Sequence, residues 1–277
     1  MRLLPFVMIG LLFATNVLAQ SNADSIVCGG SEGVPDEQIA ACTREITLEQ
    51  FSSAQLAIAY FNRGFAWSRK GDYDRAFTDY NDAIRLNPQY AIAYYNRGAT
   101  WNHKGDYDRA IADYNEVIRL NPENADAYHI RGFIQFCLGR LEASAADFAQ
   151  SLRLEHNRSY SVIWRYLALA RSPIGDSAIS ELSANAAPLA KQKWPAPVIE
   201  LLAGRLAPAA LLKAAEHRES GTRRDQLCEA GFYLGEWHLL NRRLKEGRAL
   251  LQEAERNCPN TFAESKAATV ELQRLVE

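Results

Sequence analysis

Apolar residues recur at intervals of three and four along most of the chain, the spacing that places them on one face of an α-helix. Between residues 57 and 157 this pattern is interrupted at regular intervals by short polar turns. No segment alternates between apolar and polar residues as a half-buried strand does. Four further segments with the helical period lie between residues 158 and 222: SVIWRYLALAR, SAISELSANAAPLAKQ, PVIELLAG and PAALLKAAEH. The pattern predicts an all-α fold.

The turn sequence KGDYDRA occurs twice, at Lys70–Ala76 and at Lys104–Ala110. Its charged residues fit either a duplicated catalytic or metal site or the turn of a structural repeat. Residues 57–88 and 91–122 align without a gap, with 23 of 32 residues identical and an offset of 34. A third copy at 125–156 keeps the offset and loses most surface identities. The constant offset favours a repeat, with KGDYDRA as the turn of a helical hairpin.

A 34-residue helix–turn–helix unit with small and aromatic residues at fixed places resembles the tetratricopeptide repeat, TPR. The signature residues of the first copy are Tyr60, Gly64, Trp67, Ala76, Tyr80, Ala83 and Pro88. Those of the second are Tyr94, Gly98, Trp101, Ala110, Tyr114 and Pro122. The third copy keeps Tyr128, Gly132 and Phe148. The resemblance implies a TPR superhelix of antiparallel helix hairpins with a helical C-terminal extension.

The repeated residues have physical roles in a hairpin. Glycine and alanine let the two helices approach, aspartate suits the start of the second helix, and proline ends it because proline cannot continue a helix. An arginine and an aspartate sixteen residues apart recur in all three copies, and we expect them to form structural pairs. These pairs are Arg63 with Asp79, Arg97 with Asp113, and Arg131 with Asp147.

The repeats define the expected domain organisation. Residues 20–50 form an N-terminal tail and a lone packing helix, because Gln38–Leu48 matches the second-helix pattern. Residues 158–277 form a C-terminal helical region that includes a degenerate TPR at 228–261. The three clear repeats occupy residues 51–157, as copies 57–90, 91–124 and 125–157.

The first residues, MRLLPFVMIGLLFATNVLAQ, combine an early arginine, an apolar run and small residues before Gln20, as a secretory signal peptide does. We predict a signal peptide at 1–19 and a periplasmic or secreted mature chain. The first cysteine, Cys28, is too far from this cleavage site for lipoprotein attachment. No other segment approaches about 18 consecutive apolar residues, so no stable membrane insertion is expected. A net charge of −2 gives no electrostatic footprint for nucleic acid.

Five cysteines in an exported chain indicate disulfides, because secretory compartments are oxidising. Cys228 opens the first helix of the last hairpin and Cys258 closes the second, so antiparallel packing brings them together. Cys28 and Cys42 are separated by the flexible GGSEGVP segment and the start of the lone helix, and a bridge would pin the tail onto the repeats. We predict both disulfides and leave Cys137 as a buried apolar residue or a weak thiol.

Signatures of catalysis, metal binding and cofactor binding are missing or stand in the wrong context. The GxSxG pattern at Gly29–Gly33 lacks the preceding strand and following helix of a serine hydrolase elbow. The histidines form no HExxH motif, and the chain has no phosphate-binding loop or dinucleotide fingerprint. The duplicated acids lie in outward turns. We therefore expect no catalytic residue, no metal, no cofactor and no enzymatic activity.

The TPR resemblance implies a groove lined by the first helix of each repeat, where partner segments bind. The groove positions of this chain are rich in aromatic residues, which supply large contact areas at small entropic cost. The alternative is that several of these residues pack against residues 158–222. The carboxylate clamp of chaperone-binding TPRs survives only at Asn96, which disfavours recognition of a C-terminal carboxylate. The predicted groove residues are Phe61, Phe65, Arg69, Tyr95, Asn96, Asn102, His103, His129 and Phe133.

The C-terminal half carries a second resemblance. The segments WPAPVIELLAG, CEAGFYLGEWHLL and CPNTFAESKAATVELQRL are similar to the later part of the new lipoprotein I (NlpI) type of periplasmic TPR protein. That family implies an adaptor role in the Gram-negative envelope. We expect a non-catalytic scaffold with protein or peptide partners, including peptidoglycan hydrolases or a processing protease. The alternative is a secreted or surface module that engages secretion machinery or a host protein, and a homo-oligomer is compatible with either.

Overall fold

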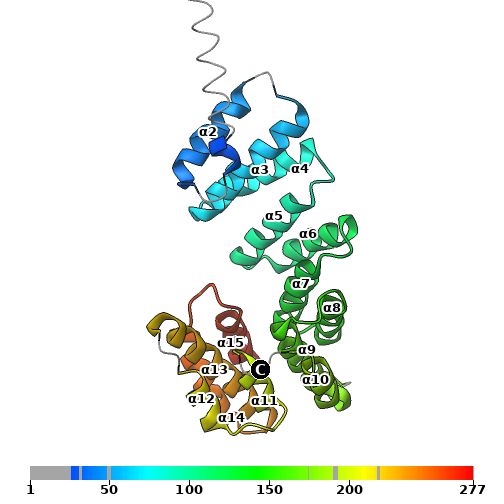
Figure 1. The fold of residues 1–277 in the computed structure, drawn as a ribbon, viewed down its shortest axis with the longest axis vertical. Coiled ribbons are helices and arrows are strands. Elements are labelled where there is room, and N and C mark those ends of the chain that lie inside the picture. Colours follow the sequence, from blue (N-terminus) through cyan, green and yellow to red (C-terminus); the bar gives the residue numbers. More distant parts are fainter. Residues whose placement is uncertain are drawn as a thin grey trace, which may run out of the picture. The chain divides into compact units, whose positions relative to one another are not determined.

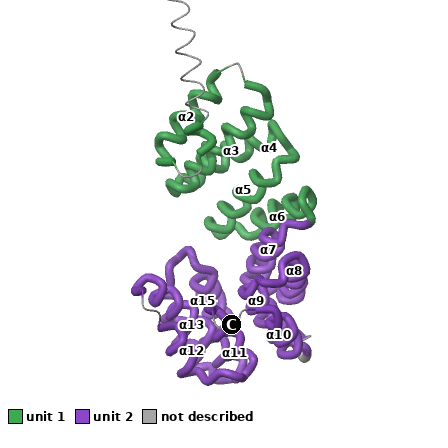
Figure 2. The backbone as a smooth tube through the Cα atoms, in the orientation of Figure 1, with its two compact units in different colours: residues 1–122 green, residues 123–277 purple. Residues whose placement is uncertain are grey.

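The structure is a computed structural model that describes residues 26–30, 33–48, 51–173, 175–189, 193–216 and 219–276. The predicted signal peptide at 1–19 lies outside these residues. Every regular element in the described residues is a helix, so the all-α prediction is confirmed. The chain forms two compact units, residues 1–122 and residues 123–277 (Figure 2).

Among the described residues, unit 1 contains the helix α2 followed by two helical hairpins, which Figure 1 labels in order. Its helices are α2 (Pro35–Thr47), α3 (Ser53–Arg69), α4 (Tyr73–Leu86), α5 (Ala91–Lys104) and α6 (Tyr107–Leu120). Helix α2 packs against α3, and Arg63 of α3 donates to the hydroxyl of Thr43 in α2 at 3.2 Å.

Unit 2 consists of two hairpins, two short helices, a last hairpin and a terminal helix (Figure 1). The first hairpins are α7 (Ala125–Cys137) with α8 (Leu141–Leu154), and α9 (Ser159–Arg171) with η1 (Gly175–Ser177) and α10 (Ala178–Ala186). The remaining helices are α11 (Ala196–Leu202), α12 (Pro208–Ala214), α13 (Ser220–Leu240), α14 (Leu244–Asn257) and α15 (Ala263–Arg274).

The KGDYDRA segments form the turns of the hairpins, as predicted. Gly105 has a φ of +78°, a conformation that glycine adopts without the steric cost of a Cβ atom. Asp106 then caps α6, because its carboxylate accepts a hydrogen bond from the backbone N–H of Arg109 at 3.3 Å. Asp72 caps α4 in the same way through Arg75. The first acid of each KGDYDRA segment is therefore a helix cap, and the second, Asp74 or Asp108, lies in the first turn of the helix.

Glycine also permits the close packing of the two helices in a hairpin. A Cβ atom on Gly64 of α3 would lie 3.0 Å from the ring of Tyr80 and 3.1 Å from Asp79, both in α4. Such contacts are tighter than carbon atoms usually make, so a larger residue here would require Tyr80 and Asp79 to shift.

The three predicted arginine–aspartate pairs are confirmed. Each joins the first helix of a hairpin to the second, with nitrogen–oxygen distances of 2.7 Å for Arg63–Asp79 and 2.6 Å for Arg97–Asp113. The third pair, Arg131–Asp147, also measures 2.6 Å. The aspartates are almost completely buried, and each accepts two hydrogen bonds from its arginine.

A fourth pair reveals a repeat that the sequence analysis missed. Arg165 and Glu181 lie 34 residues after Arg131 and Asp147, and they form the same ion pair between α9 and α10. The repeat glycine is replaced by Tyr166, which is buried, and η1 delays the start of the second helix. The hairpin of α9 and α10 is thus a divergent fourth repeat.

The boundary between the compact units falls after the second repeat, whereas the sequence analysis groups all three repeats in residues 51–157. The third repeat belongs to unit 2 because α7 packs against α9 and α15 of that unit. Helices α13 and α14 form the hairpin expected for the degenerate repeat at 228–261, and α15 packs beside them.

The two predicted cysteine pairs lie at disulfide geometry. The Cα atoms of Cys28 and Cys42 are 4.8 Å apart, and those of Cys228 and Cys258 are 5.2 Å apart. Cys137 is buried and unpaired, and burial raises the pKa of its thiol to about 12. This thiol is therefore protonated and poorly reactive at neutral pH.

The arginine–aspartate pairs generate a stability prediction. Asp113→Asn removes the charge that faces the Arg97 guanidinium, and we expect it to lower the free energy of unfolding by about 1–3 kcal/mol. Glu116→Gln is the matched control on the same helix, because Glu116 pairs with Arg119 at the surface and such pairs contribute little. Urea denaturation followed by circular dichroism measures both changes. Equal losses for the two variants would contradict a special role for the buried pair.

Disulfide formation stays a prediction that peptide mapping can test. Under non-reducing conditions we expect one peptide pair linked through Cys28 and Cys42, and a second linked through Cys228 and Cys258. Cys137 should react with an alkylating reagent only after denaturation, because its side chain is buried. A bridge that includes Cys137, or free thiols at the other four positions, would refute the assignment.

Candidate functional site

The first helices of unit 1 expose an apolar face. Ile58 of α3 is 49% exposed and Ile92 of α5 is 48% exposed, although both are large aliphatic residues. They lie 34 residues apart and occupy the same place in consecutive repeats. Exposed isoleucines repeated at one structural position make this face a candidate contact surface.

Aromatic residues continue this face. Phe61 and Phe65 of α3 are half-buried and stack with ring centroids 6.5 Å apart, and Phe61 also meets the edge of Tyr90 at 5.3 Å. Tyr95 of α5 packs against the ring of Tyr114 at 5.6 Å in a T-shaped contact. The predicted aromatic groove residues of unit 1 are therefore firmly placed and retain exposed surface.

The predicted polar groove residues of unit 1 are held near the same helices. Arg69 is exposed and donates to the carbonyl of Gly33 at 3.0 Å. Asn96 donates to the carbonyl of Ile92 at 2.9 Å, and Asn102 is half-buried. His103 stacks on Tyr73 with ring centroids 6.1 Å apart. We call the surface formed by Ile58, Phe61, Phe65, Arg69, Ile92, Tyr95, Asn96, Asn102 and His103 the unit 1 groove face.

The corresponding residues of unit 2 are covered by the chain itself. Phe133 of α7 is only 6% exposed and packs against Trp164 of α9, with ring centroids 5.0 Å apart. His129 of α7 hydrogen-bonds through Nδ1 to the hydroxyl of Ser161 at 2.7 Å. These two predicted groove residues make internal contacts, which agrees with the alternative that part of the groove packs against the C-terminal region.

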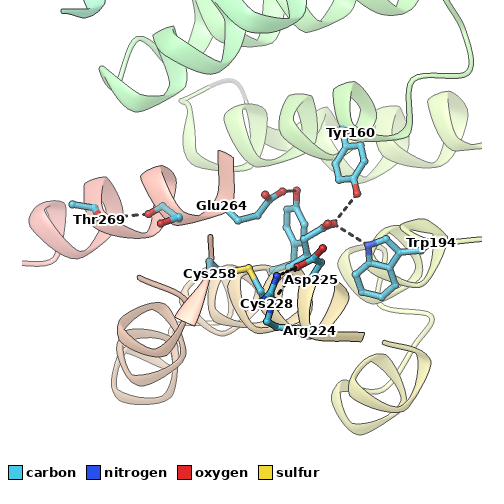
Figure 3. Close-up of a disulfide and its surroundings, with 11 residues drawn as sticks. Tyr160, Trp194, Arg224, Asp225, Cys228, Cys258, Glu264 and Thr269 are labelled. Atoms are coloured by element: carbon cyan, nitrogen blue, oxygen red, sulfur yellow. Dashed lines mark hydrogen bonds and ion pairs between the residues drawn. A yellow bond between two sulfur atoms is a disulfide. The ribbon is translucent and has the colours of Figure 1, made fainter. Parts of the chain in front are cut away.

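Helix α13 covers the first helix of the fourth repeat. Trp164 of α9 meets Phe232 and Tyr233 of α13, with ring centroids 5.6 and 6.0 Å away. Glu229 of α13 accepts hydrogen bonds from the Tyr160 hydroxyl at 2.7 Å and from the Trp194 indole at 2.8 Å (Figure 3). The sequence analysis did not foresee this contact.

Buried charges hold the C-terminal helices on α9. Arg171 at the end of α9 forms ion pairs with Glu236 of α13 and Glu271 of α15. Glu236 is fully buried, and this burial raises its pKa to about 7. Arg274 of α15 donates to the backbone carbonyls of Phe136 and Cys137 in α7, at 2.7 and 3.0 Å.

A second buried glutamate lies beside the predicted cysteine bridge. Glu264 of α15 accepts a hydrogen bond from the Tyr233 hydroxyl at 2.6 Å (Figure 3). Burial, and then the nearby Glu229 carboxylate, raise the pKa of Glu264 to about 7. Burial likewise raises the pKa of Glu229. Glu229, Glu236 and Glu264 all have partners inside the protein, so we interpret them as structural groups.

The contact between His129 and Ser161 does not form a nucleophilic pair. The Ser161 side chain is fully buried, which keeps a substrate from its hydroxyl. Burial lowers the pKa of His129 to about 4, with a contribution from the positive charge of Arg158. Among the described residues, no group of three or more histidine, cysteine, aspartate or glutamate side chains is placed to hold a metal ion. Nor is any helix of the described part of the chain long and apolar enough to cross a membrane.

Comparison with known proteins agrees with the geometry. The profile described as tetratricopeptide repeat matches residues 91–124, and a second, described as TPR repeat, matches residues 68–101. No curated protein sequence gives a significant match.

Among solved structures, YrrB, a TPR protein described as having an unusual peptide-binding site, is 18% identical. The match covers 83% of this chain and 99% of that chain, with a TM-score of 0.50. MamA from Desulfovibrio magneticus RS-1 is also 18% identical, over 60% of this chain and 93% of that chain, with a TM-score of 0.52. At these identities the likeness concerns the fold alone. With the repeat geometry and the matched profiles, it leads to one conclusion: the chain contains tetratricopeptide repeats.

Proposed function

We propose that the protein is a non-catalytic scaffold that binds a protein or peptide partner on the unit 1 groove face. The observation that carries this proposal is the exposure of Ile58 and Ile92 at equivalent places in consecutive repeats. The adjacent half-buried aromatic rings offer preformed contact area, so little side-chain entropy is lost when a partner binds. A peptide-binding site is described for YrrB, a protein of the same fold.

We further propose that the protein works in the bacterial envelope, where its partners are peptidoglycan hydrolases or a processing protease. Three sequence features support this location: the leader-like residues 1–19, the paired cysteines, and the resemblance of the C-terminal segments to NlpI-type adaptors. The two cysteine pairs at disulfide geometry suit an oxidising compartment.

Affinity capture from an envelope extract tests the scaffold function. Ile58→Lys combined with Ile92→Lys should reduce the captured partner at least about tenfold, because it places two charges in the centre of an apolar contact. Both isoleucines are half exposed, so the fold should tolerate the changes. Quantitative mass spectrometry of the captured proteins, with circular dichroism of each variant, measures the effect.

Thr78→Lys combined with Ala112→Lys is the matched control. These residues are exposed on the second helices α4 and α6, also 34 residues apart, so the control adds the same charge away from the groove face. If both double variants capture the same proteins as the unmodified chain, the groove assignment is wrong. If the purified chain hydrolyses a cell-wall or peptide substrate, the non-catalytic proposal is wrong.

A further inference from the structure

Helix α13 occupies, within unit 2, the surface that a partner would occupy on a repeat. We number the residues of each repeat from Ala57 or its equivalent, which is position 1. In the fourth repeat, positions 2, 6 and 13 are Tyr160, Trp164 and Arg171. Each of these residues of α9 contacts α13. The contact between α9 and α13 is therefore an internal example of a repeat that binds a helix.

The face of α13 in this contact has a simple composition. Glu229 meets Tyr160 at the start of α9, and Glu236 meets Arg171 at its end. Between the two acids, Phe232 and Tyr233 pack on Trp164. Residues spaced by three, four and seven positions lie on one side of a helix, so the recognised face carries an aromatic pair followed one turn later by a glutamate.

The unit 1 groove face offers related chemistry at position 13, whereas Asn62 and Asn96 take the place of Trp164 at position 6 and its aromatic rings stand at positions 5 and 9. Arg69 lies three repeats before Arg171 at position 13, and His103 takes that position in the second repeat. At position 2, Tyr160 is replaced by Ile58 and Ile92, which makes this end of the face apolar. Positions 2, 5, 6, 9, 12 and 13 of the first two repeats contain no acidic residue. A partner with a carboxylate near Arg69 is therefore electrostatically favoured over a basic one.

We infer that the partner of the unit 1 groove face is an amphipathic helix whose apolar side carries an aromatic pair and, one turn later, a glutamate. This inference rests on the proposed function and names the class of partner. The aromatic pair packs on Phe61, Phe65 and Tyr95, and the glutamate pairs with Arg69. The helix thus lies along the first helices as α13 lies along α9, with Phe61, Phe65 and Tyr95 in the role of Trp164 and with more aliphatic contact at the end near Ile58 and Ile92.

The experiment uses a fluorescent peptide of residues 224–240 with Cys228→Ser, in which Leu227→Glu and Gly231→Lys supply the carboxylate and the amine that condense, with loss of water, into a lactam bridge. These two positions lie on the opposite side of the helix from Glu229 and Glu236, and the bridge stabilises a helix too short to form reliably alone. Fluorescence anisotropy measures its binding to the full chain. A matched peptide with Leu234→Pro keeps the charges and breaks the helix, and we expect it to bind at least about tenfold more weakly.

A charge exchange locates the site. Arg69→Glu in the chain and Glu236→Arg in the peptide should each weaken binding about tenfold, and the two together should restore it to within about threefold. Arg85→Glu is the control, because Arg85 is an exposed arginine of unit 1 on the second helix α4. It should leave the affinity unchanged.

Three outcomes would overturn the inference. Equal binding of the proline peptide would show that the groove takes an extended segment. Binding unaffected by Arg69→Glu would place the peptide elsewhere, for example on α9 in place of α13. If no peptide binds while partner capture still depends on Ile58 and Ile92, the scaffold function stands and the helical partner class is wrong.

Discussion

The buried arginine–aspartate pair inside each of the first three hairpins is the interaction on which the rest of the structure depends. Asp79, Asp113 and Asp147 are almost completely buried. Separating one of these carboxylates from its arginine would leave a buried charge without a partner, which lowers the stability of the fold. The pair fixes how the second helix lies on the first. Because the same separation recurs every 34 residues, each first helix presents corresponding positions on its outer face. Residues at the same position of different repeats can therefore be compared directly.

The hairpins could be predicted from the sequence because their determinants are local. The caps at Asp72 and Asp106, the glycine turns and the ion pairs all act between residues of one repeat. The fourth repeat escaped notice because Tyr166 stands where glycine is usual and η1 displaces the second helix. Arg165 and Glu181, at the 34-residue offset, were the signal that could have revealed it.

The candidate site could be predicted only in part. Phe61, Phe65 and Tyr95 keep exposed surface on unit 1, whereas Phe133 is buried beneath residues that follow much later in the chain. Its covering by Trp164, and the packing of α13 on that same tryptophan, depend on long-range contacts that helical periodicity does not encode. All residues of α13 from Cys228 to Glu236 except Gly231 are buried, which shows that this helix is enclosed on several sides.

Helices α13 and α15 are held on α9 in part by buried charges, although apolar residues could also have filled this contact. Replacing such charges with well-packed apolar residues often costs no stability, so their effect here is better understood as fixing register. A shift of α13 by one turn would separate Glu236 from Arg171, which would leave the buried Glu236 carboxylate without its arginine and Arg171 with Glu271 alone. The position 2 residues then distinguish the two pairs of repeats, because Ile58 and Ile92 are apolar where unit 2 has Asp126 and Tyr160. One hairpin design thus yields a face in unit 2 that the chain itself covers through aromatic and charged contacts, and a face in unit 1 with two exposed isoleucines, where we propose that a partner binds.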